Sequence, residues 1–418
     1  MHHFSYRRGR LHAEGVSLTQ LAREHGTPSY VYSRATLERH YEAMDEALAG
    51  QRHLVCYSVK ANSNLAVLDV LARKGAGFDV VSGGEILRVR KAGGKASKIV
   101  FSGVGKREDE LALGLEVGIK VFNVESESEL ELLARVARRA GKVAPVSLRV
   151  NPDVDPKTHP YISTGLRTHK FGIPLEEARR LYARARRMRG IRICGIDCHI
   201  GSQLTELSPF VDALEEVKTL VLELRAEGHA IEHIDLGGGL GITYDAEVPP
   251  HPREWGRAVG EVLADLPGLE VLVEPGRVIA GNAGILLTRV LHVKQQGERR
   301  FVIVDAGMND LARPALYGAH HSILPVKAPT SDATEVVDVV GPICESGDFL
   351  AQNRTLPPVK AGELLAVMSA GAYGFTMSSN YNGRPRAAEL LVDGKSVHLA
   401  RVRETTGDLI RGERRLPR

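Results

Sequence analysis

Strand-like and helix-like segments alternate regularly along residues 54–274, and this alternation limits the possible folds more than any other feature. Eight short apolar or β-branched runs are each followed by a segment with helical periodicity. The runs span residues 54–59, 78–81, 98–102, 119–124, 145–150, 191–200, 231–236 and 270–274. Eight such units in about 220 residues are typical of a closed (β/α)8 barrel, and a doubly wound open sheet is the alternative.

The segments between these runs carry helix boundary signals. The segment 126–141 begins near Ser126, has Glu129 three residues later in a capping-box pattern, and ends at Gly141. Several of the strand-like runs are apolar nearly throughout, as expected when helices cover both faces of a parallel sheet. Both observations support an α/β fold.

The pattern changes after about residue 282, where helical periodicity fades. Short β runs follow, separated by turns such as Gln296-Gly297 and Asp393-Gly394, and they predict an antiparallel β domain. The first 27 residues fit neither pattern, and we expect them to join that second domain. The prediction is therefore a barrel at 28–282 and a β-rich domain formed by 1–27 and 283–418.

Composition excludes several classes of protein. The chain has 418 residues, of which 43% are hydrophobic and 25% charged, which is typical of a globular protein. The formal net charge is +4, and the one basic segment, at the C-terminus, has no interleaved aromatic residues, so we expect no nucleic-acid partner. No run approaches the roughly 18 apolar residues of a membrane span, and no apolar stretch follows the basic residues near the N-terminus. We expect a cytoplasmic protein with no membrane partner.

Four cysteines are too few for a disulfide framework. If residues 191–200 form a regular strand, Cys194 and Cys198 share one face and His199 points to the other. These three side chains could not then bind one metal ion. We expect buried thiols that act as small hydrophobic groups, and no metal site.

Polar residues follow the predicted strands at the end where a barrel carries its active site. Lys60 ends the first strand, where partial desolvation would favour the nucleophilic amine that a Schiff base requires. The alternative is a lysine that simply leaves the barrel into solvent. His199 ends the sixth strand and could stack on a planar ligand or act as an acid, and a core histidine is the alternative.

The loops after the seventh and eighth strands are the ones that often bind phosphate in barrels. Gly237-Gly238-Gly239 would let backbone amides approach an anion, although a tight turn is the alternative and Ile242 breaks the dinucleotide pattern. Glu274 ends the eighth strand as an inward carboxylate. A phosphate site, Glu274 and Lys60 together outline a site for pyridoxal 5'-phosphate, with Glu274 keeping the pyridine nitrogen protonated.

The segment 101–109 resembles a phosphate-binding P-loop. Its first glycine lies too close to Lys106, and Arg107 stands where Ser or Thr is required. We therefore interpret this segment as the third strand and its loop.

Five short motifs, taken in order, resemble those of the pyridoxal-phosphate decarboxylases of basic amino acids, which have the alanine-racemase-like (type III) fold. The motifs lie at 57–62, 199–202, 237–239, 274–277 and 344–346. Each is modest, but their order along nearly the whole chain is specific. Within that family the chain is most similar to the diaminopimelate decarboxylases, on residues 157–165, 170–172 and the Cys-Glu-Ser motif at 344–346.

The resemblance implies roles for the cofactor-binding residues. Lys60 would form the internal aldimine, His199 would stack on the cofactor ring, and Glu274 would pair with the pyridine nitrogen. Tyr373 would contact both cofactor and substrate. The phosphate, or the substrate beside it, would be held by Ser202, Gly239, Gly276 and Arg277.

The resemblance also implies how substrate is bound and protonated. Arg313 and Tyr317 would bind a substrate carboxylate, and Glu345 would recognise the distal ammonium. Cys344 would be the proton donor, for which the alternative on sequence alone is a buried loop thiol. In this family Cys344 and Glu345 reach the cofactor of the other subunit, so the resemblance implies a homodimer with shared active sites.

The implied reaction is the pyridoxal-phosphate-dependent decarboxylation of meso-2,6-diaminopimelate to L-lysine and carbon dioxide, the last step of lysine biosynthesis. Alternatives are a sister decarboxylase acting on ornithine, arginine or carboxynorspermidine, a racemase, or a non-catalytic relative that only carries the cofactor. The presence of both Lys60 and Cys344 argues against the non-catalytic relative.

Overall fold

The computed structural model describes residues 2–152, 154 and 170–417, and the chain divides into two compact units. The first unit comprises Met1–Leu37, Tyr244–Ala246 and Ala280–Arg418, and the second comprises Glu38–Thr243 and Glu247–Ile279. The domain boundaries expected at residues 28 and 282 stay a prediction, and residues 28–37 group with the first unit in this division.

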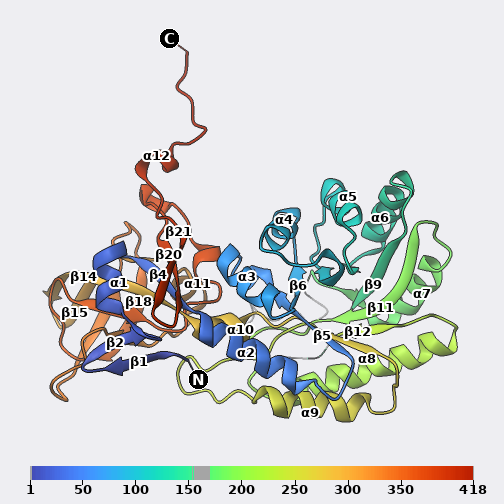
Figure 1. Ribbon diagram of the computed structural model, residues 1–418, viewed down its shortest axis with the longest axis horizontal. Helices are drawn as coiled ribbons and strands as arrows, with labels where there is room; N and C mark the ends of the chain where they lie inside the picture. Colours follow the sequence, from blue (N-terminus) through green and yellow to red (C-terminus); the bar gives the residue numbers. More distant parts are fainter. Residues whose placement is uncertain (1, 153, 155–169, 418) are drawn as a thin grey trace. The chain divides into compact units, whose positions relative to one another are not determined.

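The second unit is a closed barrel of eight parallel strands (Figure 1). β13 pairs with β5, and β8 pairs with β9, so the ring of strands is complete. A two-residue strand that the sequence did not indicate, β10 (Ile173–Pro174), adds beside β9. The predicted barrel is confirmed, with these eight strands: β5 (His53–Ser58), β6 (Gly77–Val80), β7 (Ile99–Phe101), β8 (Val121–Val124), β9 (Ala144–Asn151), β11 (Ile191–Cys198), β12 (His233–Asp235) and β13 (Glu270–Val273).

Helices lie outside these strands (Figure 1). They are α2 (Arg34–Ala47), α3 (Leu65–Arg73), α4 (Gly83–Lys91), α5 (Glu108–Val117), α6 (Glu127–Arg139), α7 (Leu175–Ala185), α8 (Ser208–Ala226), α9 (Pro252–Leu263) and the short α10 (Arg277–Ala280). In α6 the Ser126 hydroxyl accepts a hydrogen bond from the Glu129 N–H, as predicted. The Glu129 carboxylate accepts from the N–H of Glu125 rather than of Ser126, so the return bond of the predicted capping box lies one residue earlier.

A β-bulge in β11 corrects the predicted positions of its two cysteines. The pairing register with β9 shifts between Ile193 and Gly195. Cys194 therefore packs inside the barrel with buried residues of four other strands: Cys56, Val100, Val121 and Leu272. Cys198 instead lines a small space beside helices α8 and α9. The prediction that the two thiols are buried is confirmed, and the prediction that they share one face is wrong because of the bulge.

The first unit is built on a second sheet. Its main path runs through β18 (Phe349–Leu356), β17 (Glu335–Val340), β15 (Arg299–Val304), β14 (Gly284–Gln296), β4 (Ser29–Ser33), β20 (Ala388–Asp393) and β21 (Ser396–Arg401), with β19 (Leu364–Val367) on β14 and β16 (Ile323–Pro325) on β19. Most pairs are antiparallel, as predicted, but β15–β17 and β4–β20 are parallel. Long connections join these two pairs, so no hairpin dictates their direction.

The N-terminal segment belongs to this β unit. It forms β1 (Phe4–Arg7), β2 (Arg10–Ala13), β3 (Val16–Ser17) and α1 (Leu18–His25), besides β4. Phe4, Leu11 and Leu21 pack in one buried cluster with Leu287 and Leu390. The short helices α11 (Arg313–Tyr317) and α12 (Thr406–Leu409) complete the unit. The expectation that the N-terminal segment joins the β domain is confirmed.

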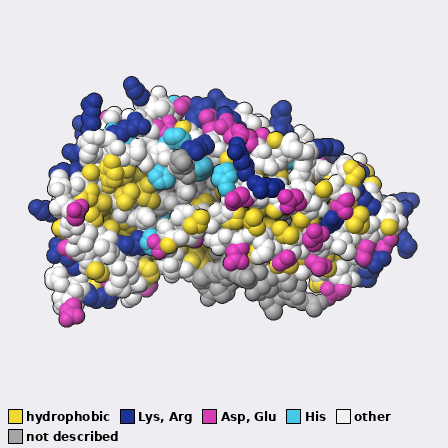
Figure 2. Space-filling model, turned by 90° about the horizontal axis from the view of Figure 1, so that it is seen from below, with side chains coloured by type: hydrophobic (Ala, Val, Ile, Leu, Met, Phe, Trp, Pro, Cys, Tyr) yellow, Lys and Arg dark blue, Asp and Glu magenta, His cyan; other side chains and the backbone are white. Residues whose placement is uncertain are grey.

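Acidic and basic side chains intermix over the face shown in Figure 2, in keeping with 55 basic and 51 acidic residues. Among the helices of the described ranges, none has both the length and the apolar character to cross a bilayer.

Candidate active site

Lys60 lies directly after β5, in a single 3-10 turn (Val59–Ala61). Its Nζ donates to Oδ2 of Asp79 over 2.9 Å, and the Ser58 hydroxyl donates to the same oxygen over 2.8 Å. Asp79, in the middle of β6, is fully buried, whereas the Lys60 side chain is 37% exposed. The Lys60 side chain is therefore partly shielded from solvent and paired with a buried acidic residue. Its role as a nucleophilic amine stays a prediction.

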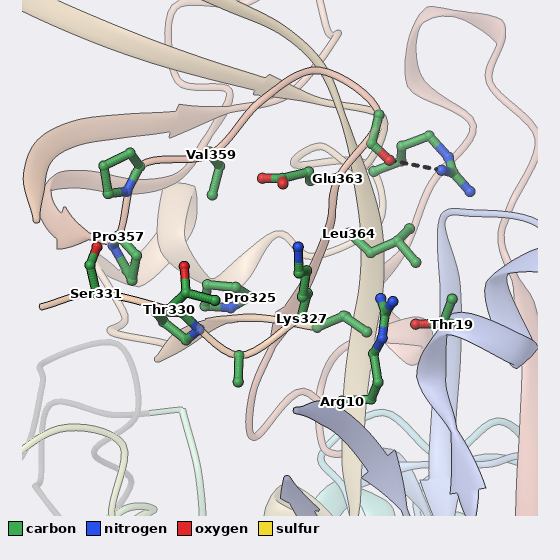
Figure 3. Close-up of a pocket in the computed structure, with 16 residues that line it drawn as sticks. Arg10, Thr19, Pro325, Lys327, Thr330, Ser331, Pro357, Val359, Glu363 and Leu364 are labelled. Carbon is green, nitrogen blue, oxygen red and sulfur yellow. Dashed lines mark hydrogen bonds between the residues drawn. The ribbon is translucent and has the colours of Figure 1, made fainter. Parts of the chain in front are cut away.

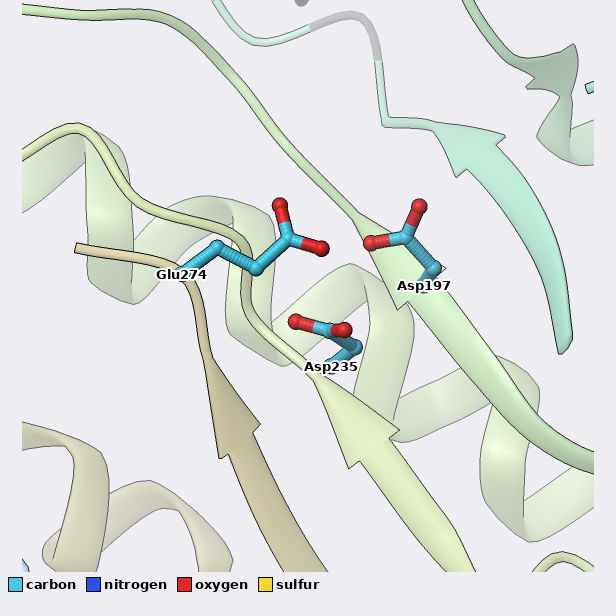
Figure 4. A group of neighbouring side chains, drawn as sticks. All are labelled: Asp197, Asp235 and Glu274. Carbon is cyan, nitrogen blue, oxygen red and sulfur yellow. The ribbon is translucent and has the colours of Figure 1, made fainter. Parts of the chain in front are cut away.

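Three buried carboxyl groups meet at the strand ends of the barrel. Asp197 comes from β11, Asp235 from β12, and Glu274 directly follows β13. One oxygen atom of each lies within 4.8 Å of the others, and Figure 4 shows the three groups pointing toward one another. Their residues are 1%, 0% and 5% exposed, so each charge in this group costs desolvation energy.

We call Asp197, Asp235 and Glu274 the barrel-floor carboxyl group. Because the three are buried close together, their protonated forms are favoured. Burial, followed by the neighbouring charge of Asp235, raises the pKa of both Asp197 and Glu274 well above its ordinary value. Burial raises the pKa of Asp235 to about 6, with the shift limited by a 2.9 Å hydrogen bond from the N–H of Gly237. Burial and mutual repulsion therefore favour the protonated form in all three carboxyl groups.

Two neutral donors also point at this group. The Ser102 hydroxyl donates to Glu274 Oε1 over 3.1 Å, and the Asn123 amide donates to Asp235 over 3.3 Å. Oδ1 of Asp197 is buried with no hydrogen-bond partner. By spacing alone the oxygens could bind a metal ion. They could equally bind a protonated ring nitrogen. Its positive charge would balance a carboxylate, and its N–H would donate a hydrogen bond to a carboxylate oxygen.

His199 follows β11 as a neutral imidazole. Burial, followed by the charges of Arg149 and Lys60, lowers its pKa well below the ordinary value. Its Nδ1 accepts a 3.0 Å hydrogen bond from the N–H of Gly238, so the ring proton lies on Nε2. A Cβ atom at Gly237 would lie 2.5 Å from that same Nδ1, which explains why glycine is needed at this position.

The predicted phosphate-binding residues lie in the loops after β11, β12 and β13. Arg277 donates through Nη2 to the Ser202 hydroxyl over 2.9 Å. Gly239 has φ +121°, and a Cβ atom there would meet the carbonyl oxygen of Gly201 at 2.7 Å. Gly276 is buried beside Arg277, a residue that is 6% exposed. Bare backbone and one guanidinium thus lie together, as an anion site requires.

The remaining predicted residues belong to the first unit. Arg313 and Tyr317 form the two ends of α11, and Arg313 is 6% exposed. Tyr373 has a positive φ of 56° in an irregular segment after β19.

Cys344 and Glu345 lie exposed on a tight loop after β17. The buried carboxylate of Asp348 accepts from the N–H groups of Ile343 and Met308, each over 2.6 Å, and so holds the base of the loop. The N–H of Cys344 donates to the side chain of Asn382 over 2.6 Å. The alternative of a buried loop thiol is therefore wrong for Cys344.

Sequence reasoning missed the acidic residues inside the strands. Asp79 and Asn123 are each the only polar side chain of strands β6 and β8, and Asp197 and Asp235 lie at or next to the ends of β11 and β12. Burying a carboxyl group costs free energy unless it is paired or hydrogen-bonded, so an acidic residue in a buried strand was the available signal of a functional site. Lys106, the lysine of the P-loop-like segment 101–109, is fully buried in an ion pair with Glu129. It is therefore not placed to bind a phosphate.

A cavity of about 420 Å³ in the first unit is lined by Arg10, Lys327, Glu363 and several prolines (Figure 3), and no predicted site residue lines it. The motif at 157–165, on which part of the family resemblance rests, lies outside the described residues.

Comparison with known proteins identifies similar chains. A family model described as "Pyridoxal-dependent decarboxylase, pyridoxal binding domain" matches residues 34–281. A diaminopimelate decarboxylase from Pseudomonas aeruginosa is 57% identical over 414 residues, which are 99% of each chain. Another, from Vibrio cholerae, is 54% identical over 418 residues, the full length of both chains.

Solved structures are similar over the same extent. The crystal structure of diaminopimelate decarboxylase from Helicobacter pylori complexed with L-lysine has a TM-score of 0.91 at 40% identity. The alignment covers 94% of this chain and 98% of that chain. The likeness therefore extends over both compact units.

Proposed function

The chain belongs to the pyridoxal-dependent decarboxylases, and among these to the diaminopimelate decarboxylases, and from this membership we propose that it converts meso-2,6-diaminopimelate to L-lysine and carbon dioxide. The observation that carries the proposal is that the barrel-floor carboxyl group, on β11, β12 and β13, lies in the same barrel as Lys60 and its partner Asp79, which lie on or directly after the next two strands around the ring. This arrangement suits a planar cofactor with one reactive carbonyl and one basic ring nitrogen.

We propose that Lys60 holds the cofactor at its carbonyl carbon, and that Glu274 faces its ring nitrogen. Pyridoxal phosphate, when bound, supplies the sink for the electron pair left by departing carbon dioxide. Glu274 can release its proton toward a basic nitrogen and remain beside it as a carboxylate, while Asp235 adds further negative charge. Neutral His199 presents a ring that adds no opposing positive charge.

The anion end of the cofactor would be held by the loops after β11, β12 and β13. Ser202, Gly239, Gly276 and Arg277 are the residues proposed for this role. The support is the Arg277–Ser202 hydrogen bond and the absence of room for a Cβ atom at Gly239.

Protonation of the substrate completes the reaction. We propose that the Cys344 Sγ–H delivers a proton to the α carbon, from which the carboxylate has left as carbon dioxide. Its exposure on a loop held by Asp348 and Asn382 leaves the thiol accessible. Because the thiolate must then regain a proton from solvent, an accessible position also suits repeated turnover.

Substrate recognition needs groups for both ends of meso-diaminopimelate. We propose that Arg313 and Tyr317 bind the distal carboxylate, with Tyr373 beside substrate and cofactor. Glu345 would recognise the distal ammonium, since a carboxylate is its natural partner. An ornithine-type substrate has no distal carboxylate and would leave Arg313 without a role.

We also propose a homodimer in which Cys344 and Glu345 act in the partner's active site. The support is that both side chains are exposed on the single chain. A cytoplasmic location is proposed on the ground that all four cysteines are unpaired, and a catalytic thiol must stay reduced.

The test is carbon dioxide release from a panel of amino acids, with pyridoxal phosphate added. The panel holds meso-diaminopimelate, its LL isomer, ornithine, arginine and carboxynorspermidine. We expect release from the meso compound, with L-lysine formed. Release only from another member would overturn the assigned substrate.

Two variants test the assigned residues. Lys60→Ala should lose the yellow colour of the bound cofactor. Glu274→Gln should keep the cofactor but slow decarboxylation by about 100-fold or more, the size typical of losing one preorganised electrostatic partner. A Glu274→Gln protein with the parent rate and poor cofactor retention would contradict the role given to Glu274.

A further inference from the structure

We propose that His321 and Tyr244 are positioning residues that fix the plane of the Arg313 guanidinium for the distal carboxylate of the substrate. This inference rests on the role proposed above for Arg313. All three residues belong to the first unit, to which Tyr244–Ala246 contribute from the segment between β12 and α9.

The His321 ring is held in one protonation state by its two partners. Arg313 Nη1 lies 2.8 Å from His321 Nε2, and a guanidinium can only donate, so Nε2 accepts. Nδ1 lies 2.8 Å from the carbonyl oxygen of Met368, which can only accept, so Nδ1 carries the proton. The ring is therefore neutral, with a single tautomer, and is 0% exposed.

The backbone around His321 is also fixed. Nη1 of Arg354 donates to the His321 carbonyl oxygen over 2.7 Å. The next residue, Ser322, accepts a 2.8 Å hydrogen bond through its carbonyl oxygen from the N–H of Met368. The imidazole thus acts as a rigid acceptor between β19 and the start of α11.

Tyr244 packs against the face of the Arg313 guanidinium and so limits its tilt. The guanidinium carbon of Arg313 lies 4.5 Å from the centroid of the Tyr244 ring, a cation–π distance. The Tyr244 and His321 rings contact each other edge to face, at 5.2 Å and 75°. One neighbour therefore packs on the face of the guanidinium, and the other accepts from its edge.

This arrangement matters because arginine binds a carboxylate with two parallel hydrogen bonds in the guanidinium plane. A plane that is fixed beforehand spares the ligand the entropy cost of ordering a flexible side chain. A ligand without the distal carboxylate makes no use of that plane. The positioning residues should therefore affect only ligands that carry the carboxylate.

L-Lysine and cadaverine differ by that one carboxylate, and calorimetric titration of each into the cofactor-loaded enzyme tests the inference directly. His321→Phe keeps an aromatic ring but removes the acceptor. We expect it to weaken the binding of L-lysine by about 10- to 100-fold, the value of a hydrogen bond to a charged group. The affinity for cadaverine should stay within about twofold of the parent value. His321→Gln keeps an acceptor and should restore most of the affinity for L-lysine.

A second pair of variants, at Tyr244, tests the inference even if substitution of the buried His321 prevents folding. Tyr244→Leu should lower the L-lysine to cadaverine affinity ratio, whereas Tyr244→Phe, which keeps the ring face, should not. His292→Phe on the exposed part of β14 is the control for the same substitution at a site without this contact.

Two outcomes would overturn the inference, and they are distinguishable. If Arg313→Ala lowers the affinity ratio while His321→Phe and Tyr244→Leu do not, only the positioning role is wrong. If Arg313→Ala also leaves the ratio unchanged, the role of Arg313 in the proposed function is wrong, and the positioning role with it.

Discussion

Each proton in the barrel-floor carboxyl group depends on the other two carboxyls, which makes its charge sensitive to single substitutions. Asp235 has its pKa raised to about 6 by burial, against an ordinary value near 4. Between these two values the folded chain binds a proton that the unfolded chain does not. Folding stability therefore falls as pH rises through this window, and the cost is then constant at higher pH.

Asp235→Asn removes this cost. Without cofactor, the free energy of unfolding of the variant should rise relative to that of the parent by about 2 kcal/mol as the pH goes from about 4.5 to 7. This follows from the linkage of roughly 1.4 kcal/mol per pH unit. Unfolding in urea at several pH values measures the difference. The control is Asp265→Asn, since hydrogen bonding to Lys218 lowers the pKa of exposed Asp265 and gives a trend of opposite sign. If the stability difference between Asp235→Asn and the parent did not change with pH, Asp235 would not have the raised pKa assigned to it.

Thiol reactivity separates Cys344 from the other cysteines. Burial raises the pKa of Cys56, Cys194 and Cys198, whereas Cys344 is exposed. We expect iodoacetamide to alkylate Cys344 first and to abolish turnover as it does so, because the thiolate is the reactive species. Peptide mass mapping against residual activity checks this.

A Cys344→Ala variant supplies the control for alkylation. It should resist inactivation, bind cofactor, and retain little turnover. Parent-like turnover in Cys344→Ala would show that another group delivers the proton.

Among the loops between elements, the one before α5 depends on a buried lysine. Lys106 Nζ donates to Glu129 over 2.7 Å and to the carbonyl oxygens of Gly103 and Asn123. Its side chain is 0% exposed. Lys106 thereby ties the loop after β7 to the end of β8 and the first turn of α6.

Lys106→Met should destabilise the protein by about 3–5 kcal/mol, because it leaves a buried carboxylate and two carbonyl groups without their donor. Urea unfolding measures the loss. Lys95→Met, in the exposed loop before β7, should change stability by less than about 0.5 kcal/mol. Adding Glu129→Leu to Lys106→Met should recover part of the loss, and no recovery would mean that the carbonyl contacts dominate.

Local patterns predicted the elements well where they are continuous. The eight barrel strands and the Ser126 cap follow from apolar runs and a capping residue that nearby chemistry fixes. The different faces of Cys194 and Cys198 could not be predicted, because the bulge between Ile193 and Gly195 depends on pairing with β9. The parallel β4–β20 pair joins residues about 360 positions apart, which no local pattern encodes.

The candidate site was predictable in part for the same reason. Residues at strand ends, such as Lys60 and Glu274, stand out because polar groups interrupt apolar runs there. Asp79 lies inside its strand and Asp235 ends its strand, and only the closure of the barrel shows that they face the same interior. The Arg313–His321 hydrogen bond likewise depends on the turn after α11.

For the molecule as a whole, β4 is an interior strand of the sheet in the first unit, paired with β14 on one edge and β20 on the other. Removing residues 1–33 should therefore leave two strand edges unpaired and give insoluble protein. Removing residues 412–418, an exposed tail where described, should change Tm by no more than about 2 °C. Soluble yield and thermal melting distinguish the two, and a soluble, stable N-terminal truncation would contradict the role of β4.

The position of β4 also governs how the protein is made. The ribosome produces this strand among the first 33 residues, but its partner β20 ends at residue 393. At about 5–20 residues per second, roughly 20–70 seconds pass before β20 emerges. During that interval the barrel strands, which pair mostly with near neighbours in the chain, are already synthesised. One edge of β4, which is buried along its whole length in the folded chain, must therefore stay unpaired through most of translation, and a nascent-chain chaperone could protect that edge from aggregation.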